Sequence, residues 1–221
     1  MNFSREHKYV FILDKFCGEK NVTQYLEALD FKFFQYGKET PLKRDNYSNL
    51  KKIPKEFMDF TLVRLVDNPY WSVINEFMKI SNENWSLKQY TKDFFIDRFN
   101  KWLNLYFENW EELYYEGIIL DGSYNFLFFD LKNGKKPHYW IKKDSIEQDL
   151  KQIPLFDGIE PKIREIFFPK SNFDFKDIYS YENARKIFKL NRDFFIETQY
   201  DPFSFTTQEL TKKEKVDFIH W

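Results

Sequence analysis

Acidic side chains gather around one tyrosine in the middle of the chain, and such a group suits the binding of a basic partner. Between residues 108 and 121 there are five acids and no Lys or Arg. Carboxylates steer a positively charged partner towards a surface, and a tyrosine supplies contact area. We therefore expect a binding face for a basic protein such as a toxin or a nuclease. Its residues are Glu108, Glu111, Glu112, Tyr115, Glu116 and Asp121.

Five lysines follow, with no acid between them. They are Lys132, Lys135, Lys136, Lys142 and Lys143. Asn133-Gly134 separates two aromatic-rich runs and predicts a tight hairpin turn, because both residues tolerate positive φ. The lysines could protect an edge strand, bind an anion at the hairpin tip, or pair with the acids of residues 108–121. Only through this lysine hairpin, residues 132 to 143, do we expect any contact with nucleic acid.

Composition excludes several kinds of site. Cys17 is the single cysteine, and His7, His138 and His220 are far apart in the chain, which argues against disulfides and against metal centres built on Cys or His. We expect no cofactor and no metal, although Mg²⁺ held by carboxylates stays open. The net charge of −1 argues against general nucleic-acid binding. Apolar runs are too short for a membrane span or a signal peptide, so we expect a cytoplasmic protein.

Two short motifs resemble those of S-adenosylmethionine-dependent DNA methyltransferases. The turn at 14–18 (DKFCG) follows an apolar run, as in the first motif of that family, and 67–70 (DNPY) resembles its Asp/Asn-Pro-Pro-Tyr motif. The resemblance implies that Gly18 lines a cofactor pocket. It also implies that Asp67 and Tyr70 hold a flipped base.

Asp121 and the Asp130-x-Lys132 pattern resemble the Mg²⁺ site of restriction-type nucleases. The predicted hairpin argues against this site, since Asp130 would lie several residues along the next strand at about 3.3 Å per residue. No hydrolase motif is present either. The sequence therefore favours a non-catalytic binding protein of the immunity or inhibitor type, with the methyltransferase as the alternative.

One long amphipathic helix is expected to organise the chain, from about residue 86 to 116. Ser86 and Gln89 form a capping-box pattern at its start, and Gly117 suits its C-terminal cap. Apolar residues recur at helical spacing along it. They are Phe95, Phe99, Trp102, Leu103, Tyr106, Phe107, Trp110, Leu113 and Tyr114. We expect the domain to wrap around this face.

The fold class expected is α+β, as a mainly helical single domain over residues 1–221 with a small antiparallel meander at about 118–142. A strand is predicted at 8–13, and helices at 69–80 and from Asn21, as N-cap, to Tyr36. Residues 54–67 fit either a helix or a strand, and we favour the helix. Thr206 with Glu209 predicts the cap of a final helix.

Overall fold

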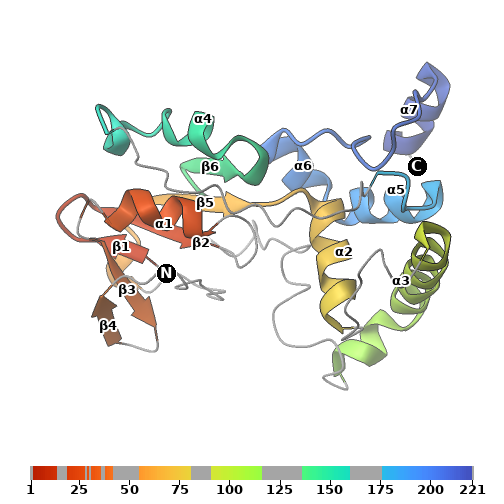
Figure 1. Cartoon of the computed structure of the whole chain (residues 1–221), viewed down its shortest axis with the longest axis horizontal. Helices are drawn as coiled ribbons and strands as arrows, with labels where there is room; N and C mark the ends of the chain where they lie inside the picture. The colour runs from red at the N-terminus through yellow and green to blue at the C-terminus, as the bar shows by residue number, and fades with distance from the viewer. Residues whose placement is uncertain are drawn as a thin grey trace. The chain divides into compact units, whose positions relative to one another are not determined.

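The computed structural model describes residues 2–13, 19–27, 29, 31–35, 38–41, 55–80, 91–115, 136–159 and 176–220 (Figure 1). The chain forms two compact units, and each unit is built from two separate segments. Unit 1 comprises Met1–Asp67 and Asp130–Lys170, and unit 2 comprises Asn68–Phe129 and Ser171–Trp221. We expected a single domain over residues 1–221. The structure does not establish whether the two units form one domain, so this expectation stays a prediction.

Unit 1 contains a six-stranded mixed sheet with the order β4-β3-β1-β2-β5-β6. The pairs β4-β3, β3-β1 and β1-β2 are antiparallel, whereas β2-β5 and β5-β6 are parallel. Together with the helices, this sheet supports the predicted α+β class. The strands are β1 (Asn2–Ser4), β2 (Tyr9–Leu13), β3 (Lys32–Gln35), β4 (Lys38–Pro41), β5 (Thr61–Val66) and β6 (Tyr139–Lys142).

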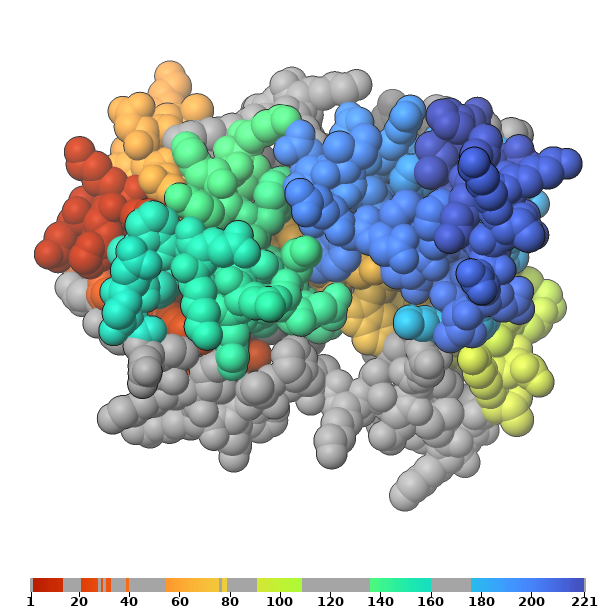
Figure 2. Space-filling model, turned by 90° about the horizontal axis from the view of Figure 1, so that it is seen from above, coloured from red at the N-terminus to blue at the C-terminus, as the bar shows by residue number. Residues whose placement is uncertain are grey.

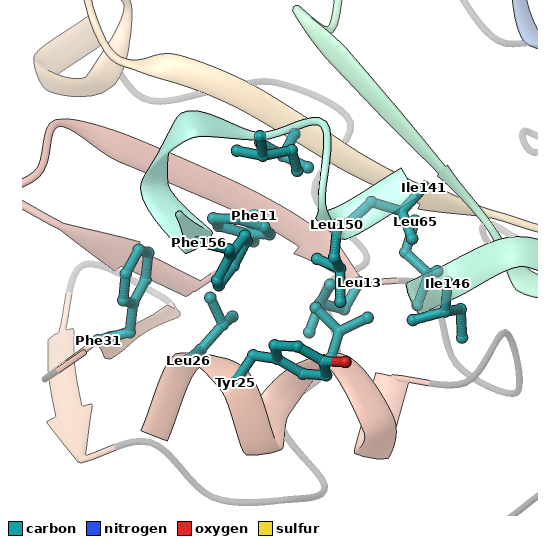
Figure 3. Packing of buried hydrophobic residues seen from close by; sticks show 13 residues of the cluster. Phe11, Leu13, Tyr25, Leu26, Phe31, Leu65, Ile141, Ile146, Leu150 and Phe156 are labelled. Carbon is teal, nitrogen blue, oxygen red and sulfur yellow. The ribbon is translucent and has the colours of Figure 1, made fainter. Parts of the chain in front are cut away.

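Both faces of the sheet are buried in its middle, and the strand β2 shows why. Phe11 and Leu13 point into a core with α1 (Glu19–Glu27), α4 (Ile146–Leu150) and the 3-10 helix η4 (Pro154–Phe156). Figure 3 shows Tyr25 and Leu26 of α1 directed into this cluster. Val10 and Ile12 point the other way, towards the 3-10 helix η1 (Lys55–Phe57). The period of two residues therefore places alternate apolar side chains in two separate cores.

The strand β5 corrects the helix that we favoured over residues 54–67. Val63 and Leu65 are buried in the core with α1, and Leu62 is buried in the core on the other face. A strand buried on both faces has a nearly continuous apolar sequence, so it lacks the alternation that usually identifies strands. The β-branched residues of TLVRLV were the better guide.

A strand also replaces the end of the helix predicted from Asn21 to Tyr36. α1 begins at Glu19 and ends at Glu27, so Asn21 lies in its first turn and is not its N-cap. The aromatic-rich segment that follows forms β3, which pairs with β1. Phe33 fitted the helical stripe by its spacing, but aromatic residues also favour strands.

The predicted antiparallel meander is not confirmed. Of its strands only β6 lies among the described residues, and β6 pairs in parallel with β5, with Leu65 opposite Ile141. His138 extends this ladder, because its N–H donates to Leu62 O (2.7 Å). Residues 116–135, with the Asn133-Gly134 turn, lie outside the described part.

The regular elements described in unit 2 are all helices. α2 (Pro69–Ile80) and α3 (Lys92–Tyr115) come from its first segment. α5 (Tyr181–Leu190), α6 (Arg192–Thr198) and α7 (Lys212–His220) come from its second. Within these ranges no helix is both long and apolar enough to cross a membrane.

α3 is the long helix that the sequence predicts, with a later start. Phe94 N–H donates to Thr91 Oγ1 (3.3 Å), so Thr91 caps the helix, and the Ser86 and Gln89 pattern lies outside the described residues. The predicted apolar arc is buried at Phe95, Phe99, Leu103 and Tyr106. α3 belongs to unit 2 whereas the sheet belongs to unit 1, so its role as the centre of the whole chain is not confirmed.

The last helix is capped by a later pair than predicted. Thr211 N–H donates to Glu214 Oε2 (2.8 Å), and Glu214 N–H donates to Thr211 Oγ1 (3.3 Å). This is a capping box, and α7 follows it at once. Thr206 and Glu209 have the same spacing, but Thr206 instead donates its hydroxyl to Asp177.

Candidate ligand-binding site

Three neighbouring parallel strands of unit 1 end level with one another. Leu13 of β2 is opposite Leu65 of β5, and Leu65 is opposite Ile141 of β6. In open α/β sheets, ligands bind outside the carboxyl ends of parallel strands. We call the ends of β2, β5 and β6, together with the described residues that follow β5 and β6, the carboxyl edge. It is the part of unit 1 in which this rule places a site.

A buried ion pair, Asp67 with Lys143, lies at the carboxyl edge. Val66 and Lys142 are opposite one another in the β5-β6 ladder, so the next residue on each strand brings Asp67 beside Lys143. Lys143 Nζ donates to Asp67 Oδ2 at 2.8 Å. The Lys143 side chain is 10% exposed and that of Asp67 is 2% exposed. Burying two charges carries a large desolvation cost, so such a pair at a strand end favours a functional role.

The turn that carries Lys143 is held by a second carboxylate. Asp149 Oδ2 accepts hydrogen bonds from Lys142 N–H (2.7 Å) and from Ser145 Oγ (2.8 Å). Ile146 and Leu150 anchor α4 in the core beneath the sheet face. Glu147 of α4 is exposed, and the teal segment that contains α4 and η4 forms part of the molecular surface (Figure 2). The position of Lys143 is therefore fixed by both the ladder and α4.

Asn21 adds a polar group near the same edge. It lies in the first turn of α1, the helix that follows β2, and is 4% exposed. Its Oδ1 is buried without a hydrogen-bond partner among the described residues. Helical side chains lean towards the N-terminus of their helix, which here is the end next to the carboxyl edge. A buried acceptor of this kind is costly, and a ligand hydroxyl or amine could satisfy it.

The DNPY motif forms the start of α2. Asn68 Oδ1 accepts from Tyr70 N–H (3.0 Å), and Pro69 takes the first helical position. Tyr70 is 3% exposed, and its hydroxyl donates to Pro202 O (2.7 Å). Burial raises the Tyr70 pKa far above its usual value. Tyr70 and Asp67 are thus engaged inside the protein, and neither is presented to a base; Gly18 lies outside the described residues.

Four of the six residues of the predicted acidic face belong to α3. Glu108 is exposed, and the last turn of α3 contains no basic residue. The backbones of three further members belong to α3, and two members lie outside the described part, so the face stays a prediction. These members are Glu111, Glu112 and Tyr115 on the helix, and Glu116 and Asp121 beyond it.

The five predicted lysines do not share one environment. Lys136 is exposed and Lys142 is partly buried, whereas Lys143 is buried against Asp67. Lys132 and Lys135 lie outside the described residues, as do Asp121 and Asp130 of the nuclease pattern. Lys143 therefore pairs with Asp67, a carboxylate at the end of a strand. The sequence interpretation did not identify this pairing. The sequence did contain a signal for this pair, since Asp67 and Lys143 each follow an apolar run. The signal could be used only if β5 was recognised as a strand.

The described residues hold no group of three or more His, Cys, Asp or Glu side chains that could bind a metal ion. Comparison with known proteins finds no matching family model, no similar curated protein and no similar solved structure. Proposals on function are therefore based on the geometry of the chain itself.

Proposed function

We propose that the protein binds a nucleotide-type ligand outside the carboxyl ends of β2, β5 and β6. The observation that carries this proposal is the buried pair of Asp67 and Lys143 at the level end of three parallel strands. Open α/β sheets bind ligands at that edge, and buried charges are concentrated at functional sites.

The chemistry of the edge favours a ligand with a negative group and a hydroxyl or amine. The N-terminus of α1 and the ammonium of Lys143 both attract negative charge. Asn21 Oδ1 requires a donor. The ends of β2 and β6 flank β5, so they lie about 10 Å apart at the usual strand spacing. A nucleotide is long enough to serve both ends, whereas a single phosphate ion is not.

The resemblance to methyltransferases gains one element of support. β2 and β5, which precede the two motifs, are adjacent and parallel, so both motifs follow strands at the same edge. The packed position of Tyr70 argues against the base-binding role that the resemblance implies. S-adenosylmethionine is accordingly one ligand to test, and DNA is not required for the proposal.

A binding screen tests the proposed function directly. We expect adenosine phosphates or S-adenosylmethionine to raise the melting temperature, since a ligand at 100 times its Kd stabilises the folded state by about 2.7 kcal/mol. Isothermal titration calorimetry should then give a saturable isotherm, with free ribose as the control ligand. If no nucleotide at millimolar concentration changes the melting temperature or gives heat, the proposed function is wrong.

A second candidate is the docking of a basic protein on the end of α3. Glu108 is exposed there, and Leu105, one turn earlier, is 58% exposed, so an apolar contact lies beside the negative charge. Reversing Glu111 and Glu112 to Lys should abolish capture of the partner and leave the melting temperature unchanged. The matched control reverses Asp93 and Asp217, which are exposed elsewhere in unit 2. Equal capture by both double variants would rule out this face.

A further inference from the structure

We propose that Lys143 binds the negative group of the ligand and that Asp67 is a positioning residue, which holds the Lys143 ammonium in place. This inference rests on the proposed function, because it names the residues of the same edge that meet the ligand. No motif in the sequence assigns Lys143 this role.

The two side chains lie at different depths. Asp67 is 2% exposed and Lys143 is 10% exposed, and 2.8 Å separate Oδ2 of the carboxylate from Nζ of the ammonium. The Lys143 side chain therefore keeps a small exposed surface, whereas that of Asp67 has almost none. Of the two, Lys143 is the side chain that a ligand can reach, and an ammonium attracts a phosphate or another anion.

The position of the ammonium is fixed before any ligand arrives. The backbone of Lys143 follows the β5-β6 ladder on one side and the turn bound by Asp149 on the other. Its side chain ends on Asp67. A charged group held by packing and by a second residue needs little reorganisation when it binds a ligand. Asp67 therefore contributes to binding without touching the ligand.

Asp67 also supplies a negative charge beside the buried ammonium, which would be costly to bury alone. Other charges close in the chain are Asp144, Lys142, Glu147 and Asp149, on the same turn and on α4. Asp144 and Glu147 are exposed, and Asp149 is engaged by Lys142 N–H and Ser145. Asp67 Oδ2 lies within ion-pair distance of Lys143 Nζ, at 2.8 Å.

Titration calorimetry with inorganic phosphate and with ATP tests the role of Lys143. We expect Lys143→Met to weaken binding of both by about tenfold or more, since hydrogen bonds to charged groups are the strong ones. Lys151→Met is the matched control, because Lys151 is exposed at the end of α4. This variant should bind phosphate and ATP with the wild-type affinity. The double variant Asp67→Asn/Lys143→Met leaves no unpaired buried charge, so it should fold stably and still bind weakly.

Affinity and stability, measured side by side, separate positioning from a structural role. Asp67→Asn should weaken ATP binding under conditions where the variant is fully folded, because a neutral amide holds the Lys143 ammonium less firmly than a carboxylate does. Asp67→Glu should restore most of the affinity, since it keeps the carboxylate. A purely structural carboxylate would lower the melting temperature of Asp67→Asn and leave its affinity for ATP at the wild-type value.

The possible failures are distinguishable. If the wild type binds neither phosphate nor ATP nor any other nucleotide, both the proposed function and this inference fail. If the wild type binds ATP and Lys143→Met binds it equally well, the inference alone is wrong. If Lys143→Met binds weakly but Asp67→Asn binds ATP with the wild-type affinity, the positioning role of Asp67 is wrong.

Discussion

Asp177 accepts hydrogen bonds from both the backbone and the side chain of Thr207, thirty residues further along the chain. Thr207 N–H donates to Oδ1 at 2.8 Å, and the Thr207 hydroxyl donates to Oδ2. The hydroxyl of Thr206 adds a third donor at 2.6 Å. Asp177 has a φ of 66°, in the left-handed region that Asp and Asn tolerate better than most residues. One carboxylate therefore ties the segment before α7 to the segment before α5.

Asp177→Asn should weaken the folded state of unit 2 in a pH-dependent way. Desolvation alone would raise the Asp177 pKa, but the hydrogen bonds from Thr206 and Thr207 outweigh it and lower the pKa. A folded pKa below the unfolded one stabilises the protein above the unfolded value of about 3.9, and the contribution is lost as the pH falls through the folded pKa. Urea unfolding should show a destabilised variant at pH 7 and a smaller difference from wild type at pH 3.

Asparagine is the appropriate substitution, because it keeps the left-handed backbone favourable while it removes the charge. Asp193→Asn is the control, since Asp193 is exposed on α6. A destabilisation by Asp177→Asn that is equal at pH 7 and pH 3 would contradict the linkage.

Asn100→Ala should be among the most destabilising polar substitutions in unit 2. Asn100 Nδ2 donates to Ile178 O (2.7 Å), and its Oδ1 accepts from Ser180 N–H (3.1 Å) and Asn183 Nδ2 (3.0 Å). One amide thereby joins α3 to the start of α5. Loss of these bonds leaves several groups without partners, at about 1–3 kcal/mol for each buried one. Chemical denaturation of this variant and of Asn104→Ala, an exposed position one turn later on α3, makes the comparison. Equal stabilities would refute the role of Asn100.

Tyr179→Phe should destabilise unit 2 more than Tyr181→Phe. The Tyr179 hydroxyl donates to Tyr70 O (2.6 Å) in a buried position, so its removal leaves a buried carbonyl without that donor, at about 1–3 kcal/mol. The Tyr181 hydroxyl donates to Glu214 O (2.9 Å) at an exposed position, where water can replace it. Thermal and urea unfolding measure both variants. The prediction is wrong if the two substitutions cost the same.

The sequence predicted the elements whose pattern is local. The apolar arc of α3 repeats at helical spacing over several turns, so Phe95, Phe99 and Leu103 could be assigned to its buried face. The helix at 69–80 agrees with α2, because a cap residue and Pro69 mark its start. In these segments, signals from residues close together in the chain were enough to predict the helix.

The candidate site could not be predicted in the same way, because it depends on partners distant in the chain. Asp67 and Lys143 are 76 residues apart, and only the β5-β6 register brings them together. The acidic and basic groups stood out in the sequence because many charges of one sign lie close together in the chain. The buried pair consists of two single residues at strand ends. They can be recognised as a pair only when β5 is known to be a strand that runs parallel to β6.

His138→Phe should loosen the pairing of β5 with β6. Leu62 N–H donates to His138 Nδ1 (2.9 Å), so the imidazole supplies the acceptor that continues the ladder. Nδ1 accepts only when it carries no proton, so the neutral ring holds its proton on Nε2. Phenylalanine removes the acceptor and leaves the Leu62 amide without it, at a cost of about 1–3 kcal/mol. Hydrogen exchange at Leu62 should accelerate.

His138→Asn distinguishes the hydrogen bond from the bulk of the ring, because an asparagine Oδ1 can accept from the same amide. We expect His138→Asn to keep most of the protection at Leu62 that His138→Phe loses. His220→Phe, at an exposed position of α7, should leave Leu62 exchange at the wild-type rate. If His138→Phe and His138→Asn accelerate exchange equally, the ring contributes by packing and its nitrogen does not hold the ladder. Loosening this ladder should also weaken ligand binding at Lys143, because β6 carries that residue to the carboxyl edge.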